Sequence, residues 1–366
     1  MDQGLHVHLP QEIIYKVLLR IPAEFLNTLK CVCKLWFDLI SSHKFVDAHV
    51  TRHAGDLAQI LVCRDSKLGP LKREYEIVSI QDIKNTRFQL QHHQLEVLLN
   101  DEIYLQSSCD GLLLFESRNK EYQLYVCNPI TRKCSVLPLL KKTVLNLEWT
   151  LVHDGSTCKY KVVGLSTDTP RCFVFTLHGN HTKKTTTTTT TPTCWRELSM
   201  PYQDSLFLSP LTLLKNELHW LAKFPGKEQD ILYLFSMDIA KKNFRDIQVP
   251  ISSRRPWNKI IEVKGSLCLT DYCECSNQLD IWTLEAEASI WIKNYSINLK
   301  LSGPVTLCSY PSSTYSCETR VLIWRKNQIF VFDLENSSLE RIDIPTEEGM
   351  RVRHNIVHIS SLVKWE

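Results

Sequence analysis

Residues 111–137 have the sequence GLLLFESRNKEYQLYVCNPITRKCSVL, in which three short apolar segments alternate with polar segments. The segments Gly111 to Phe115, Leu124 to Cys127 and Ser135 to Leu137 are rich in residues that favour strands. Asn128 to Arg132 is a turn-forming segment, because Asn and Pro both favour tight reversals of the backbone. The stretch therefore predicts part of a small antiparallel sheet.

The same arrangement returns along the chain at a nearly constant interval. The strand centres are separated by 47, 49, 60, 47 and 50 residues, and they lie at Val78, Tyr125, Val174, Leu234, Ile281 and Val331. A period of about 50 residues with four strands per unit is typical of the blades of a kelch-sized β-propeller. The long interval contains a low-complexity loop, residues 182–193, with seven threonines at Thr185 to Thr191. We predict about six four-stranded units, although a seventh blade or an open, sandwich-like array fits the same period.

The two ends of this strand-rich region are expected to meet. A last strand-like segment, Ile356 to Val363, follows the sixth unit, and the first strand is expected at Gln59 to Cys63. Pairing between these segments would close the ring and remove an exposed sheet edge. The predicted propeller-like domain therefore spans residues 57–365.

The preceding segment, residues 5–52, has a helical pattern instead. Its apolar residues recur at intervals of three and four, and Pro10 and Pro22 suit the starts of helices. Apolar residues on more than one face of short helices must be covered. Two explanations fit, a module that docks into a partner and a helical cap on the chain's own domain.

One motif favours the docking module. Lys30-Cys31-Val32-Cys33-Lys34-Leu35-Trp36, together with Leu9-Pro10 and Ile21-Pro22, resembles the F-box in its plant form. The resemblance implies a helical hairpin that binds the Skp-type adaptor of a cullin ubiquitin ligase and, through it, the cullin and RING subunits. The residues that it implies for adaptor binding are Leu9, Pro10, Ile13, Ile14, Val17, Leu18, Ile21, Pro22, Leu26, Val32, Cys33, Trp36, Leu39 and Ile40.

Three positions depart from the usual F-box pattern. Asn27 and Thr28 stand where the family usually has Leu and Arg, and Leu35 replaces a common Ser. Asn27 removes an apolar side chain, so we predict a weaker contact with the adaptor at this position.

Two segments of the strand-rich region resemble the plant F-box-associated domain. They are Ser107 to Leu113 and Cys127 to Arg132, with weaker matches at Leu218 to Leu221 and Leu279 to Trp282. The resemblance implies a propeller-like domain that recognises substrates. We assign Gly111 and Asn128-Pro129 to the fold, because these residue types suit turns. The predicted fold class is thus α+β multidomain, with an all-α helical hairpin followed by an all-β propeller.

Composition excludes several other classes of function. Lys and Arg number 43 and Asp and Glu 40, and no long basic run is present, so nucleic acid is not an expected partner. The first residues form no apolar leader and no run of about 18 apolar residues occurs. We therefore expect a cytoplasmic or nuclear protein that is neither secreted nor membrane-spanning. The 14 cysteines are expected to be reduced.

The sequence contains none of the common catalytic motifs. It has no nucleophile elbow, Walker loop, dinucleotide-binding glycine pattern or His-Glu-x-x-His, and only 11 glycines. We predict no catalytic residue, metal or cofactor. Two functions remain open: a non-catalytic ligase adaptor that promotes ubiquitination and proteasomal degradation of a target, and a glycan-binding propeller or channel-site enzyme with a helical cap.

One face of the predicted propeller collects cations and aromatic residues. If the strands of each blade run a, b, c, d, the b–c loops and d–a connections share a face, whereas the threonine loop, Asp110 and Asn128 belong to the other. Arg binds carboxylate and phosphate through a bidentate fork, and aromatic residues serve as anchors. We predict that this face binds an acidic, phosphorylated or glycosylated target through Arg171, Tyr202, Arg254, Arg255, Trp257, Tyr272, Arg351 and Arg353.

Overall fold

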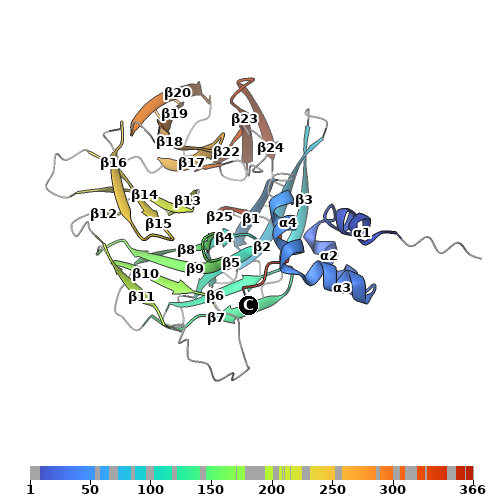
Figure 1. Ribbon diagram of the computed structural model, residues 1–366. Helices are drawn as coiled ribbons and strands as arrows, with labels where there is room; N and C mark the ends of the chain where they lie inside the picture. The colour runs from blue at the N-terminus through green and yellow to red at the C-terminus, as the bar shows by residue number, and fades with distance from the viewer. Residues whose placement is uncertain are drawn as a thin grey trace, which may run out of the picture.

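The computed structural model gives the arrangement of most of the chain (Figure 1). It describes residues 9–53, 58–65, 73–83, 87–95, 103–117, 122–140, 146–169, 171–177, 194–200, 206–207, 209, 211–214, 216–224, 231–251, 258–285, 289–299, 306–309, 320–325, 328–343, 352–358 and 360–365. The predicted threonine loop, residues 182–193, lies outside the described residues.

Four helices open the described chain, rather than a simple hairpin. They are α1 (Gln11–Leu18), α2 (Ala23–Leu29), α3 (Lys34–Ser41) and α4 (His43–His53). Pro10 and Pro22 directly precede α1 and α2, each in an extended conformation. Proline suits these positions because the first backbone N–H groups of a helix have no partner within it.

Six sheets follow, and their strands are antiparallel to their neighbours. The first sheet contains β1 (Ala58–Asp65), β2 (Arg73–Ile83) and β3 (Arg87–Leu95), with β25 (Val352–His358) from the other end of the chain. The second and third sheets contain β4 (Ile103–Cys109), β5 (Leu112–Ser117), β6 (Gln123–Asn128), β7 (Lys133–Val136), β8 (Leu147–Asp154), β9 (Lys159–Ser166), β10 (Arg171–Thr176) and β11 (Arg196–Ser199).

The remaining three sheets complete the ring (Figure 1). The fourth contains β12 (Leu206–Phe207), β13 (Thr212–Leu214), β14 (Glu217–Lys223), β15 (Tyr233–Asp238) and β16 (Phe244–Gln248). The fifth and sixth contain β17 (Lys259–Val263), β18 (Ser266–Cys273), β19 (Gln278–Glu285), β20 (Ile290–Asn298), β21 (Thr306–Ser309), β22 (Arg320–Arg325), β23 (Gln328–Asp333) and β24 (Ser338–Asp343).

The strand count of one sheet differs from the prediction. Five of the described sheets have four strands, instead of the six that we predicted, and the fourth sheet has five. The reason is that β12 and β13 pair with successive parts of β14, end to end, as two parts of one interrupted strand. Pro210, which has no backbone N–H to donate, lies between them in the sequence.

The ring closes where the sequence indicated. β25 pairs antiparallel with β1, with Ile60 opposite Val357, so the expected pairing of the two ends is confirmed. The strand begins at Val352, four residues before the predicted Ile356. β25 also contacts β4, the first strand of the second sheet, so the chain's end is built into the ring.

A shared device shapes three of the turns between the last two strands of a sheet. The side-chain oxygens of Asn128, Asp238 and Asp333 each accept hydrogen bonds from the backbone N–H groups two and three residues later. The fourth residue after each has a positive φ, at Arg132, Lys242 and Ser337. Asn and Asp are favoured at such turns because their side chains satisfy the turn's backbone donors.

The prediction that all cysteines are reduced is wrong at one pair. Cys127 and Cys134 lie directly opposite each other on β6 and β7 and form a disulfide. Neighbouring positions on paired strands bring the two sulfur atoms together, which the spacing in sequence did not reveal. Nine other cysteines within the described residues form no disulfide.

Candidate functional site

The outer surface of the helices exposes an unusual number of large apolar side chains. Ile13 and Val17, one helical turn apart on α1, are 43% and 52% exposed. Others of this kind on the helical segment are Leu9, Phe25, Val32, Leu35 and Phe37. Pro10, Pro22 and Cys33 are also exposed. A set of exposed apolar side chains on one short segment is typical of a surface that binds another protein.

The inner surface of the same helices belongs to the core. Leu18, Leu26 and Ile40 have no exposed surface and pack in one cluster with residues of the second and third sheets, including Leu112, Val126 and Leu151. The sequence prediction assigned these three residues to adaptor binding, but they are covered by the chain itself. Ile14, Ile21, Trp36 and Leu39 are half-buried against the same cluster. The helices are thus packed against the ring of sheets, and Figure 1 shows them at its right.

Asn27 has a role that its departure from the family pattern did not suggest. Its side-chain amide donates a hydrogen bond of 3.3 Å to the backbone carbonyl of Ile130, in the turn between β6 and β7. The side chain therefore faces the propeller. It links α2 to the second sheet, and the weaker adaptor contact expected at Asn27 stays a prediction.

The last described residues hold the helices and the second sheet together. This C-terminal strap, residues 360–365, buries Leu362 and Val363 in the cluster that contains Leu18 and Ile40. Its backbone carbonyls at Ser361 and Val363 accept hydrogen bonds of 3.1 and 2.9 Å from the Asn128 amide. Figure 1 shows the C-terminus beside β6 and β7.

Gly111 and Asn128 act in the fold, as predicted. Asn128 is fully buried, and its oxygen caps the β6–β7 turn while its amide binds the strap. Gly111 has φ +84, and a Cβ atom there would lie 2.8 Å from the backbone nitrogen of Ser361. Glycine is required because the strap approaches so closely and because the backbone is left-handed. Ser361 Oγ also donates to the Asp110 carbonyl.

Two histidines of α4 connect it to the end of α1. His49 Nε2 lies 2.8 Å from the Ile21 carbonyl, and His53 Nε2 lies 2.9 Å from the Leu19 carbonyl. Burial lowers the pKa of His49 from 6.5 to about 4. The neutral His49 imidazole therefore donates to a carbonyl that the helix end leaves without a partner. Sequence reasoning missed both residues, although their spacing of four places them on one helical face.

The predicted target-binding residues have different outcomes. Arg171, at the start of β10, forms an ion pair of 2.7 Å with Glu197 and lies over the Phe173 ring. Tyr272 is fully buried in the fifth sheet, so it is not on the predicted surface. Its position in β18 alternates with outward residues, and the pattern did not reveal which face was covered. The side chains of the others lie outside the described residues: Tyr202, Arg254, Arg255, Trp257, Arg351 and Arg353.

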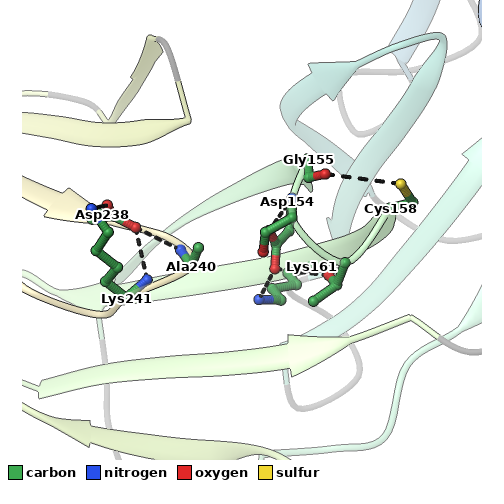
Figure 2. Close-up of polar contacts among 9 residues, drawn as sticks. Asp154, Gly155, Cys158, Lys161, Asp238, Ala240 and Lys241 are labelled. Carbon is green, nitrogen blue, oxygen red and sulfur yellow. Dashed lines mark hydrogen bonds and ion pairs between the residues drawn. The ribbon is translucent and has the colours of Figure 1, made fainter.

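A small pocket lies where the third and fourth sheets meet. We name it the cationic pocket and define it by its lining residues: Lys161, Val174, Thr176, Cys194, Arg196, Leu198 and Lys242. Its volume is about 70 Å³. Figure 2 shows the two turns beside it, with Asp154 and Lys161 on one sheet and Asp238 and Lys241 on the other. The sequence prediction missed this site, because its cations are far apart in the chain.

The described part of the chain contains no group of three His, Cys, Asp or Glu side chains placed to hold a metal ion. None of its described helices is long and apolar enough to cross a bilayer.

Comparison with known proteins agrees with this architecture. Residues 7–47 match the model of the F-box domain, and residues 60–363 match that of the F-box associated β-propeller domain. An F-box/kelch-repeat protein of Arabidopsis thaliana is 21% identical over 98% of this chain and 99% of its own length. An F-box protein of the same plant is 21% identical over 92% of this chain and 85% of its own.

Among solved structures, TolB from Acinetobacter baumannii matches with a TM-score of 0.49 and 10% identity, over 89% of this chain and 72% of that one. An oligogalacturonate lyase bound to manganese matches with a TM-score of 0.41 and 13% identity, over 74% and 70%. The two family matches together span most of the chain, and the second alone covers more than half of it. The chain therefore belongs to the F-box proteins that carry an F-box associated β-propeller domain.

Proposed function

We propose that this protein is the substrate-recognition subunit of a Skp-cullin-F-box ubiquitin ligase. The F-box would bind the Skp-type adaptor and, through it, the cullin and RING subunits. The propeller would bind a target protein and promote its ubiquitination and proteasomal degradation. The observation that carries the proposal is the exposed apolar surface on helices whose other side is packed on the propeller.

The chain's own part in this reaction is to hold the target, without a catalytic group. A ligase of this kind accelerates transfer by raising the effective concentration of the target near the charged enzyme. The connection between the two domains supports this role. Asn27 of α2 bonds to the β6–β7 turn, and the C-terminal strap bonds to Asn128 at the start of that turn. The adaptor and the target would therefore keep a fixed separation.

We further propose that the protein acts in the cytoplasm or nucleus. The proposal is supported by the described cysteines that form no disulfide, such as Cys172 and Cys268, since thiols persist in reducing compartments.

Co-purification tests the proposal. Full-length protein, expressed in plant cells with the proteasome inhibited, should bring down a Skp-type adaptor and a cullin. Val17→Asp should abolish both, because it places a charge on the exposed apolar surface of α1. Ile290→Asp is the matched control, since Ile290 is a similarly exposed apolar residue on β20, at 55%. Absence of the adaptor from the wild-type sample, or its retention by Val17→Asp, would contradict the proposal.

A further inference from the structure

We propose that the cationic pocket binds an anionic side chain of the target, either a phosphorylated residue or a carboxylate. The identification of the ligand as part of a target protein rests on the proposed function. The binding of an anion in the pocket does not depend on it. This site differs from the predicted surface of b–c loops and d–a connections, because it lies near the turns of the opposite face.

Strand register places the pocket at the margin of an apolar interface. Lys161 pairs with Thr176, and Val174 pairs with Arg196. Directly paired residues point to the same side of a sheet, as do alternate residues of one strand. The same side carries Val163, Leu165 and Cys172, which pack against Trp220 and Met237 of the fourth sheet. The pocket therefore begins where apolar packing between two neighbouring sheets ends.

The Lys161 ammonium is held in place by Asp154, a buried carboxylate that accepts several hydrogen bonds. Asp154 is fully buried and accepts hydrogen bonds from the Ser156 backbone, at 3.0 Å, the Ser156 and Thr157 hydroxyls, at 2.6 and 2.8 Å, and Lys161 Nζ, at 2.5 Å. Burial alone would raise the pKa of Asp154, but the Lys161 ammonium and these donors together lower it. The ammonium has three N–H groups, and only one of them is used by Asp154.

The other two cations have no ion-pair partner among the residues that the structure describes. Within the described residues, neither Arg196 nor Lys242 forms an ion pair, whereas Lys241 pairs with Asp238 at 3.7 Å. Because Asp154 neutralises Lys161, the lining carries an excess of positive charge from Arg196 and Lys242. No carboxylate is among the described lining residues.

Lys242 is held in place by its turn. Asp238 caps the turn by accepting from the backbone N–H groups of Ala240 and Lys241, as Figure 2 shows for Ala240. Lys242 then takes the left-handed conformation, with φ 59. Its side chain reaches the pocket from the fourth sheet, while Arg196 and Lys161 come from the third. An anion between them would be contacted by both sheets.

The size of the pocket limits the ligand to a small charged group. Its volume of about 70 Å³ is several times the roughly 15 Å³ that one ordered water requires. It can hold a phosphoryl or carboxylate group but not a large side chain. A guanidinium and two ammonium groups suit such an anion, because hydrogen bonds between charged partners are the strongest type available. The pocket would thus anchor one residue of a longer target segment.

Alkylation of Cys194 tests anion binding directly. Cys194 is an exposed free thiol in the pocket lining. Full-length protein would be treated with iodoacetamide, which is neutral, in inorganic phosphate, in acetate or in chloride at equal ionic strength. Peptide mass spectrometry would give the rate at each cysteine. We expect phosphate to slow alkylation at Cys194 several-fold, without changing Cys275, an exposed cysteine of the fifth sheet.

Variants separate the pocket from general effects of salt. Arg196→Gln with Lys242→Asn should remove the protection, and Asn is chosen because it tolerates the left-handed backbone. Lys241→Asn, in the same turn but outside the pocket lining, should keep it. Protection by phosphate alone assigns a phosphorylated ligand, and protection by acetate as well assigns any acidic residue. Equal rates in all three anions, or protection that survives the double substitution, would overturn the proposal.

The adaptor gives an independent readout of the proposed function. If the double variant and the wild type bind the adaptor equally but Cys194 is never protected, the pocket inference fails and the ligase proposal stands. If Cys194 is protected but no adaptor binds, the pocket holds an anion and the ligase proposal fails.

Discussion

The two sides of the F-box helices have similar composition and opposite environments. Ile13 and Val17 face outward, whereas Leu18 and Ile40 lie in the same cluster as the second and third sheets. All four belong to the motif that resembles the F-box. The difference shows that one set of apolar residues serves two purposes, since the inner part attaches the helices to the propeller and the outer part remains available to a partner.

The largest expected effect compares two isoleucines. Ile40→Ala should destabilise the protein by about 2–5 kcal/mol, because it leaves a cavity among fully buried side chains. Ile13→Ala removes the same atoms from a side chain that is 43% exposed, and it should cost less than about 1 kcal/mol. Urea denaturation of both variants measures the difference. Equal losses of stability would show that the two sides are not distinct.

Acid should destabilise the protein through His49. The folded pKa of His49, about 4, is below the ordinary 6.5, so the unfolded chain binds the proton first as pH falls. The neutral imidazole therefore contributes stability that is present above pH 6.5 and is lost as the pH falls toward 4. The loss should reach about 3 kcal/mol at most. Denaturation midpoints between these pH values would record it.

A matched pair of variants assigns that acid sensitivity to a region. His49→Gln should reduce the pH dependence of the denaturation midpoint that comes from the helices. His219→Gln should reduce the part that comes from the fourth sheet, where burial also lowers a histidine pKa to about 4. An unchanged pH profile for His49→Gln would show that α4 does not carry a buried neutral histidine.

The third prediction compares two turns that share a cap. Asn128→Ala removes the cap of the β6–β7 turn and both hydrogen bonds to the C-terminal strap, at a fully buried position. It should cost about 1–3 kcal/mol. Asp333→Ala removes the equivalent cap of the β23–β24 turn without a strap, and should cost about 1 kcal/mol. Thermal unfolding would rank them, and the reverse order would contradict the role of the strap.

The smallest expected effect is at Asn27. Asn27→Leu restores the residue that the F-box family usually has, but it removes the hydrogen bond to Ile130. Because the side chain faces the propeller, adaptor affinity should stay unchanged and stability should fall by about 0.5–1.5 kcal/mol. Calorimetric titration with a Skp-type adaptor checks the first part. A clearly tighter complex would restore the interpretation that Asn27 faces the adaptor.

The repeat and the ring closure could be predicted because strands and turns leave local patterns. Val78 to Val331 mark a period, and Asn128-Pro129 marks a turn whose cap the structure confirms. The division of the helices could not be predicted, since α1 has apolar residues on both sides and nothing local distinguishes Ile13 from Leu18. Burial is decided by contacts with Leu112 and Leu362, which are distant in the chain.

The cationic pocket could not be predicted from the sequence either, because its residues are distant in the chain. Lys161, Arg196 and Lys242 come from two sheets and are brought together by register and by a capped turn. The disulfide between Cys127 and Cys134 likewise depends on strand pairing. Pro210 in the sequence argues against one continuous strand across β12 and β13, so the interruption could have been predicted.

One titration can decide whether the outer side of the helices binds the adaptor while the inner side holds the propeller. The dissociation constant of a purified Skp-type adaptor would be measured for the full-length wild type and for Val17→Asp, with unfolding midpoints recorded alongside. We expect Val17→Asp to weaken binding at least about 30-fold, equivalent to a hot spot of about 2 kcal/mol, and to leave the midpoint unchanged. Equal dissociation constants for the two proteins would contradict it.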